Sequence, residues 1–189
     1  TAAGGGWNCD RMSLVFPYEI QKNGCTGTCT HMIAGSYRVY ESVNGAIGAT
    51  TTARWYVNSG DLTKNTLVDR SFINQLNYAW SDATKAIVGT NDGNVQWGRN
   101  LGVGTANTAV WVNLTGGNAV LPNRPILDLA LGPANPLIGH AAVGGLAQKP
   151  PTPPGPVFPG ISHTHLPRLT LGNKSPHPPN PPPQSNTPN

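Results

Sequence analysis

Few side chains in this sequence could carry acid–base chemistry. The chain has eight carboxylates, which are Asp10, Glu19, Glu41, Asp61, Asp69, Asp82, Asp92 and Asp128. Hydrolysis of a glycan generally needs two such groups, one protonated as the acid and one ionised as the base or nucleophile. Asp61, Asp82 and Asp92 stand in predicted turns, where a carboxylate accepts hydrogen bonds from backbone amides. Asp128 lies between two leucines of an alternating strand and faces away from them, so it is the best catalytic candidate.

Aromatic side chains offer a second kind of chemistry, because the C–H face of a sugar stacks on an aromatic ring. Trp7, Trp80 and Trp97 are the candidate ligand-binding residues, whereas Trp55 and Trp111 are expected in the core. The arginines are scattered singly and match no arginine motif for binding a carboxylate, so we assign them no catalytic role.

No group of residues has the spacing of a metal site. His31 follows Cys29 by two residues, which is not a usual zinc spacing, and His163 and His165 lie in a proline-rich segment. We therefore expect neither a metal nor a cofactor.

Three cysteines lie within the first 30 residues. Cys25 and Cys29 share a Gly/Thr-rich loop and are expected to form a short disulfide, with free thiols as the alternative and Cys9 left over. Asn113 and Asn173 each begin a sequon for N-glycosylation. Together with few charges and many Thr and Asn residues, the clustered cysteines favour an extracellular or periplasmic location.

The composition narrows the fold class and the partners. Charged residues make up 11% of the chain, against about a quarter in typical domains, while 23 Gly and 19 Pro favour a turn-rich all-β protein. The net charge is +4, but the basic residues form no run that would follow a phosphate backbone, so nucleic acid is not expected. No apolar stretch is long enough for a membrane span, and the start of the sequence lacks the pattern of a signal peptide.

Internal repeats are the most informative feature of the sequence. Three landmarks recur in order, at Gly35, Gly89 and Gly144, then at Val39, Val95 and Val157, then at Trp55, Trp111 and Leu171. The second and third landmarks are 16 residues apart in both of the first two units. An alternating strand precedes each set, with one face formed by Met12, Leu14 and Phe16, by Leu76, Tyr78 and Trp80, and by Leu127, Leu129 and Leu131. The pattern predicts three four-stranded units, at about 10–62, 72–118 and 125–175.

Four-stranded units of this size are typical of the blades of a β-propeller. We therefore predict an all-β protein with propeller blades of four antiparallel strands over residues 1–149. Fourteen of the 19 prolines fall in the proline-rich segment 150–189, which is expected to be partly the last blade and partly a disordered tail. Propellers close with about four to eight blades. Three units therefore predict a fragment or incomplete record of a larger propeller, or self-association that completes the ring.

The residues of the second and third units resemble a known family. Gly89-Thr-Asn-Asp-Gly-Asn-Val95, Trp111-Val-Asn-Leu-Thr-Gly116 and Ala141-Ala-Val-Gly-Gly145 are similar to a blade of the Asp-box, or BNR-repeat, propellers, which include sialidases, xyloglucan-cleaving glycoside hydrolases and the sortilin ectodomain. The resemblance covers about residues 30 to 175 and implies a propeller fold. The family motif is Ser/Thr-x-Asp-x-Gly-x-Thr-Trp. Here Asn44 and Asn100 stand in place of its Asp, each 11 residues before its Trp, so the box is degenerate and implies no catalytic residue.

Three functions are compatible with this sequence. The leading hypothesis is a secreted propeller module that binds glycans or proteins. The first alternative is a glycoside hydrolase of the BNR-repeat type, xyloglucanase-like or sialidase-like, and the second is a structural or assembly scaffold.

Overall fold

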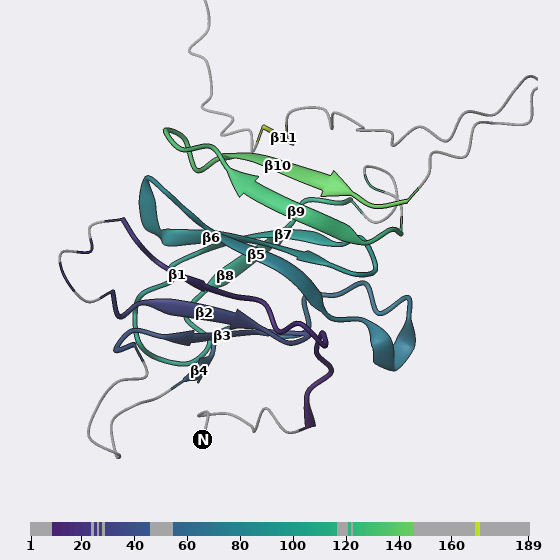
Figure 1. Ribbon diagram of the computed structural model, residues 1–189, viewed down its shortest axis with the longest axis horizontal. Helices are drawn as coiled ribbons and strands as arrows, with labels where there is room; N and C mark the ends of the chain where they lie inside the picture. The colour runs from purple at the N-terminus through teal and green to yellow at the C-terminus, as the bar shows by residue number, and fades with distance from the viewer. Residues whose placement is uncertain are drawn as a thin grey trace, which may run out of the picture.

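The computed structural model describes residues 9–23, 25, 27, 29–45, 55–116, 121 and 123–145, together with the backbone of residues 169–170. Over these ranges the protein is all-β and contains three antiparallel sheets that follow one another along the chain (Figure 1). This confirms the expected all-β class with antiparallel four-stranded sheets. The described part contains no closed sheet.

Each sheet is a meander. The first sheet contains β1 (Tyr18–Ile20), β2 (Met32–Gly35), β3 (Val39–Ser42) and β4 (Tyr56–Val57). The second sheet contains β5 (Ile73–Ala79), β6 (Asp82–Thr90), β7 (Val95–Arg99) and β8 (Val110–Asn113). The third sheet contains β9 (Ile126–Leu131), β10 (Ile138–Val143) and β11 (Leu169–Thr170). Every hydrogen-bonded pair joins strands that are consecutive in the chain, so each sheet lies within one of the three repeat units.

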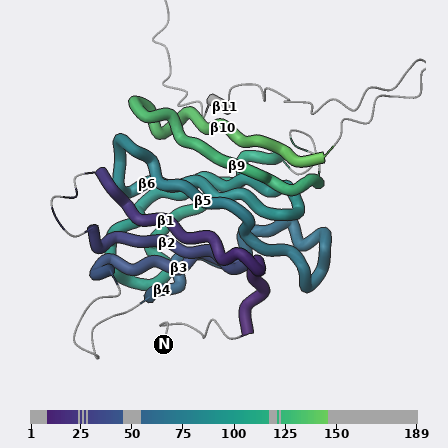
Figure 2. Tube along the Cα trace, in the orientation of Figure 1, coloured from purple at the N-terminus to yellow at the C-terminus, as the bar shows by residue number. Residues whose placement is uncertain are grey.

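The sheets are stacked in layers, with the second sheet in the middle (Figure 2). One core lies between the first and second sheets and consists of Ile33, Val39, Leu62, Ile73, Leu76, Tyr78, Ala86, Val88 and Leu101. The other lies between the second and third sheets and consists of Ala79, Ile87, Val95, Trp97, Leu121, Ile126, Leu129, Leu131 and Ala141. Alternate side chains of β6 therefore enter different cores, as the period of two along a strand requires.

One contact is repeated at both junctions between sheets. A Cβ atom at Gly35 in β2 would lie 2.8 Å from Cγ2 of Ile73, the first residue of the second sheet. A Cβ atom at Gly89 in β6 would lie 2.5 Å from Cγ2 of Ile126, the first residue of the third sheet. In each case the missing side chain leaves the space that the isoleucine of the next sheet occupies.

The strand register corrects the third glycine landmark. Gln75 pairs with Gly89 after a bulge in β5, and Asp128 pairs with Ala142 after a bulge in β9. Ala142, which is exposed, is therefore the equivalent of Gly89, and the expected landmark Gly144 lies two residues further on.

The first strand of the first sheet lies later than the alternating pattern of Met12, Leu14 and Phe16 predicts. Pairing begins where the Pro17 carbonyl accepts the Gly35 N–H (3.0 Å), and Tyr18 is the first strand residue. Pro17 has no N–H to return a hydrogen bond, which favours the start of pairing at this point. Met12 and Leu14 are exposed.

Two other residues of the alternating pattern leave their expected face. Trp80 follows the last residue of β5 and is exposed in the turn, whereas Leu76 and Tyr78 are buried as predicted. The bulge in β9 turns Leu127 away from the core that Leu129 and Leu131 enter.

Helix is nearly absent from the described ranges. Val68–Arg70 forms one turn of 3₁₀ helix, η2, in the link between the first and second sheets. Within these ranges, no helix has the length and apolar character needed to cross a membrane.

Candidate functional site: the loop end of the sheets

Three segments meet at one end of the first two sheets, which we call the loop end. They are residues 9–17 before β1, the β2–β3 hairpin at 36–38, and the link 58–72 that leads to β5 (Figure 1). Loops placed by a rigid scaffold are where binding residues concentrate. The opposite end, the turn end, carries the β1–β2, β5–β6 and β9–β10 connections.

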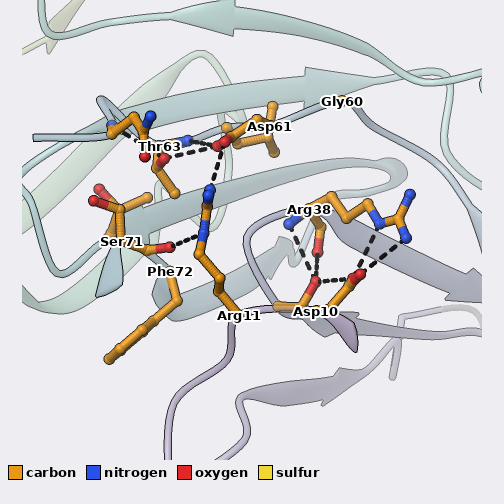
Figure 3. A network of polar contacts seen from close by, with 12 residues as sticks. Asp10, Arg11, Arg38, Gly60, Asp61, Thr63, Ser71 and Phe72 are labelled. Carbon is orange, nitrogen blue, oxygen red and sulfur yellow. Dashed lines mark hydrogen bonds and ion pairs between the residues drawn. The ribbon is translucent and has the colours of Figure 1, made fainter. Parts of the chain in front are cut away.

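Asp10 ties the first segment to the hairpin. Its Oδ2 accepts hydrogen bonds from Ser36 Oγ (2.7 Å), Arg38 Nε (3.0 Å) and Tyr40 OH (2.6 Å), and its Oδ1 accepts one from Arg38 Nη2 (2.9 Å) (Figure 3). The Asp10 side chain is almost fully buried. One carboxylate thus holds three side chains of the hairpin.

These contacts shift the pKa values of the network. Burial alone would raise the pKa of Asp10, but the hydrogen bonds from Arg38, Tyr40 and Ser36 outweigh it and hold that pKa below its usual value. Burial, together with the hydrogen bond to Asp10, raises the pKa of Tyr40 to about 12. Asp10 is therefore an ionised acceptor at neutral pH, which suits a positioning role.

Arg11 ties the same segment to the link. Its Nη2 donates to Asp61 Oδ2 (2.6 Å) and its Nε donates to the Ser71 carbonyl (3.1 Å) (Figure 3). Two guanidinium groups lie over the Tyr37 ring, with Cζ of Arg11 at 4.6 Å and Cζ of Arg38 at 5.2 Å from its centroid. The charges of the network are paired, so it fixes the three segments relative to one another.

Exposed apolar side chains gather on the segments that Arg11 joins and at the start of β1. Of the eleven large hydrophobic residues exposed in the described ranges, six lie at this end, and they are Met12, Leu14, Val15, Tyr18, Leu67 and Val68. Val15 is 80% exposed and Val68 is 66% exposed. We call these six residues the apolar rim. Exposed apolar groups held on a scaffold are typical of interaction sites.

The link presents Leu67 and Val68 in a defined conformation. Val68 has a φ of 51°, which is uncommon for a β-branched residue and costs backbone strain. Hydrogen bonds from Arg70 N to the Leu67 carbonyl (3.1 Å) and from Leu67 N to Ser71 Oγ (3.1 Å) hold the turn. The backbone thus holds two apolar side chains outward at an energetic cost.

A second polar network is buried between the first and second sheets. The fully buried Glu41 carboxylate accepts hydrogen bonds from His31 Nε2, from Asn58 Nδ2 and from the Gly102 N–H (2.7 Å). The His31 ring lies 5.0 Å from the ring of Tyr78, whose buried hydroxyl has no hydrogen-bond partner among the described residues. Burial, followed by the nearby Glu41 charge, raises the pKa of Tyr78.

Asn58 extends this network to the loop between β7 and β8. Its side-chain oxygen accepts hydrogen bonds from Thr108 N (2.8 Å) and Ala109 N (2.9 Å), and its carbonyl accepts one from Trp111 Nε1 (2.9 Å). The network therefore fastens the first sheet to the second. The described ranges contain no group of three or more His, Cys, Asp or Glu residues that could hold a metal ion.

The predicted ligand-binding and catalytic residues lie outside the three segments of the loop end. Trp80 is 61% exposed at the turn end, whereas Trp97 is 7% exposed and donates from Nε1 to the Pro136 carbonyl (3.0 Å) within the core. Trp7 lies outside the described residues. Asp128 is exposed on β9, where its Oδ1 accepts a hydrogen bond from Leu129 N (2.8 Å).

The other predicted sites fall in three groups. Cys25 and Cys29 lie at disulfide-bond distance with Cα atoms 5.4 Å apart, and Cys9 is an exposed free thiol. Asn113 is exposed at the end of β8. Asn173 and the histidines at 163 and 165 lie outside the described residues.

The expected turn role of the carboxylates is also visible. Asp61 accepts hydrogen bonds from Thr63 N (2.9 Å) and Asp82 accepts one from Thr84 N (2.9 Å), both within local turns. Asp92 accepts a hydrogen bond from Thr90 Oγ1 (2.5 Å).

The sequence reasoning missed the Asp10–Arg38 and Arg11–Asp61 pairs. A local signal was present, because Ser36, Arg38 and Tyr40 alternate along one hairpin and so share one face that needs an acceptor. The acceptor itself is 26 residues or more away in the chain, and no local pattern identifies it.

No protein-family model matches the chain, and neither a curated protein nor a solved structure gives a significant match.

Proposed function

We propose that this chain is a secreted, propeller-type binding module whose ligand is another protein, bound at the loop end. The observation that carries the proposal is the apolar rim, with five exposed hydrophobic side chains on two segments that Arg11 joins and a sixth, Tyr18, at the start of β1. Protein interfaces combine an apolar centre with polar surroundings. The paired charges of Asp10, Arg11, Arg38 and Asp61 supply those surroundings beside the rim.

The propeller part of the proposal rests on the meander topology and on the stacking of consecutive sheets. The first strand of the second sheet, β5, contacts β1 and β9, the first strands of its neighbours. This arrangement is typical of adjacent propeller blades. The disulfide between Cys25 and Cys29 supports the secreted location.

A glycan ligand is the second candidate, and Trp80 is the observation that favours it. Its exposed ring at the turn end is available for stacking on a sugar. One ring provides little binding surface compared with the apolar rim, so we place this function second.

A glycoside hydrolase would need a free pair of carboxylates. Asp10, Asp61 and Asp82 each pair with an Arg or Lys, and Glu41 is buried with three donors. These partners hold four of the eight carboxylates in structural roles, which argues for binding ahead of hydrolysis.

Site-specific photo-crosslinking tests the proposal. A photoreactive amino acid is placed at position 14 or 67 in the apolar rim, or at Val103 as an exposed apolar control at the turn end. The protein is incubated with the extracellular fraction of its native source. We expect one discrete adduct from positions 14 and 67 that excess unlabelled protein competes away, and none from position 103.

Adducts that are equal at all three positions, or none at positions 14 and 67, would overturn the loop-end assignment. Glycan-array binding that is lost in Trp80→Ala would favour the second candidate instead. If neither the crosslinked adduct nor glycan-array binding is found, the scaffold function is the better account.

A further inference from the structure

We propose that Asn113 is the acceptor of an N-linked glycan, and that this glycan covers the free edge of the second sheet. The inference depends on the secreted location in the proposed function, but not on the protein ligand. It concerns β8, the last strand of the second sheet, and none of the six residues of the apolar rim.

The amide of Asn113 is held in a defined orientation by its own sequon. Its Oδ1 accepts a hydrogen bond from Thr115 N (2.8 Å) and lies 2.6 Å from Thr115 Oγ1. The Thr115 hydroxyl is buried and lies 2.6 Å from Asn94 Oδ1, so it is fixed in turn. These contacts use the carboxamide oxygen and leave Nδ2 without a hydrogen bond in the described part of the chain, on an exposed residue.

The strand that carries Asn113 needs protection. β8 is the last strand of the second sheet and pairs only with β7, and Val110 and Val112 on it are exposed. The corresponding strand of the first sheet is β4. It is covered by the loop between β7 and β8, because the Val57 carbonyl accepts a hydrogen bond from Asn107 N (2.9 Å). No described residue covers β8 in this way. An uncovered edge with apolar side chains promotes pairing with other chains.

A glycan at the end of β8 would meet this need, because it is bulky and hydrophilic. In the transfer, Asn113 Nδ2 forms a bond to the anomeric carbon of an oligosaccharide carried on a lipid pyrophosphate. The bond from that carbon to the phosphate oxygen breaks, the pyrophosphate leaves with the electron pair, and an amide proton passes to a base of the transferase. The middle residue of the sequon is Leu114, so no proline blocks it.

The full chain, secreted from a eukaryotic host, tests the acceptor site by intact mass and peptide mapping before and after enzymatic removal of N-glycans. We expect a glycan on the Asn113 peptide that is absent in Asn113→Gln and Thr115→Ala and retained in Thr115→Ser. Thr115→Ser keeps the buried hydroxyl and controls for folding. An unmodified Asn113 peptide overturns the proposal, whether or not Asn173 carries a glycan.

The covering role has its own readout. Size-exclusion chromatography with light scattering compares the glycosylated protein, the same protein after glycan removal, and Asn113→Gln. We expect the glycosylated form to stay monomeric at concentrations where the other two self-associate, and Val112→Lys to restore the monomer in Asn113→Gln. If Asn113→Gln remains monomeric throughout, the glycan does not protect the edge.

Discussion

Asp10 is the residue on which the geometry of the loop end depends most. Its carboxylate accepts hydrogen bonds from Ser36, Arg38 and Tyr40, and these hydrogen bonds lower its pKa. A carboxylate whose pKa is lower in the folded than in the unfolded protein stabilises the fold above its unfolded pKa. That stabilisation is lost as the pH falls through the folded pKa.

We therefore predict that Asp10→Asn lowers the free energy of unfolding by about 2 kcal/mol at pH 7, the range for hydrogen bonds to a charged group. The difference from wild type should shrink as the pH falls below the ordinary aspartate pKa of 3.8, because the unfolded wild type then binds a proton that folded Asp10 does not, and the difference is lost below the folded pKa. Urea denaturation at several pH values measures this. Asp69→Asn is the matched control, because Asp69 is exposed and should change little. A difference independent of pH would contradict the assignment.

Substitutions of Tyr78 and Glu41, which belong to one buried network, should affect stability differently. The Tyr78 hydroxyl has no hydrogen-bond partner in the part of the chain that the structure describes, so Tyr78→Phe should preserve stability or raise it by up to about 1 kcal/mol. Glu41→Gln replaces one carboxylate oxygen with an NH₂ group that faces donors, and should cost about 3 kcal/mol. Thermal unfolding of both variants compares them directly. A destabilised Tyr78→Phe would mean that the hydroxyl has a bound partner such as water.

At the scale of elements, the repeated glycine contact governs how sheets stack. Gly35→Ala and Gly89→Ala place a Cβ atom against Ile73 and Ile126, and each should cost about 1–3 kcal/mol through overpacking. Ala142→Gly at the equivalent exposed position should cost less than about 1 kcal/mol. Denaturant midpoints of the three variants test this order. Equal effects at all three positions would refute the packing role of the two glycines.

The sequence alone predicted most of the elements, because local patterns encode them. Alternation over Leu76 and Tyr78, and the turns that follow β5 and β9, gave the strands that the structure contains. The bulge that turns Leu127 outward could not be predicted, since it depends on the register with β10. The loop end was missed for the same reason. Asp10 contacts side chains that are distant in the sequence, and such partners leave no local periodicity.

At the scale of the whole molecule, burial is uneven across the three layers. The second sheet contributes to both cores, whereas the first and third sheets each contribute to one. Segments with more buried apolar contacts open less often.

Hydrogen–deuterium exchange should therefore be slowest in β6 and β7 and faster in β3 and β10. Peptide-resolved mass spectrometry at neutral pH measures this order. Mild reduction of the Cys25–Cys29 disulfide should change the exchange rate only in the peptide that contains it, since this disulfide closes a very short loop. Exchange in β10 as slow as in β6 would show that a further layer covers the third sheet.

The two glycine contacts also bear on how such a chain can lengthen. The second sheet offers Ile73 to the sheet before it and Gly89 to the sheet after it. A tandem duplication of the segment that encodes this sheet would place Ile73 of the new copy against Gly89 of the old one, which is the same pairing of glycine and isoleucine that joins the existing layers. The junction to Ile126 would then be formed by the new copy of Gly89, so an ancestral gene could have gained a layer without a single compensating substitution at either contact.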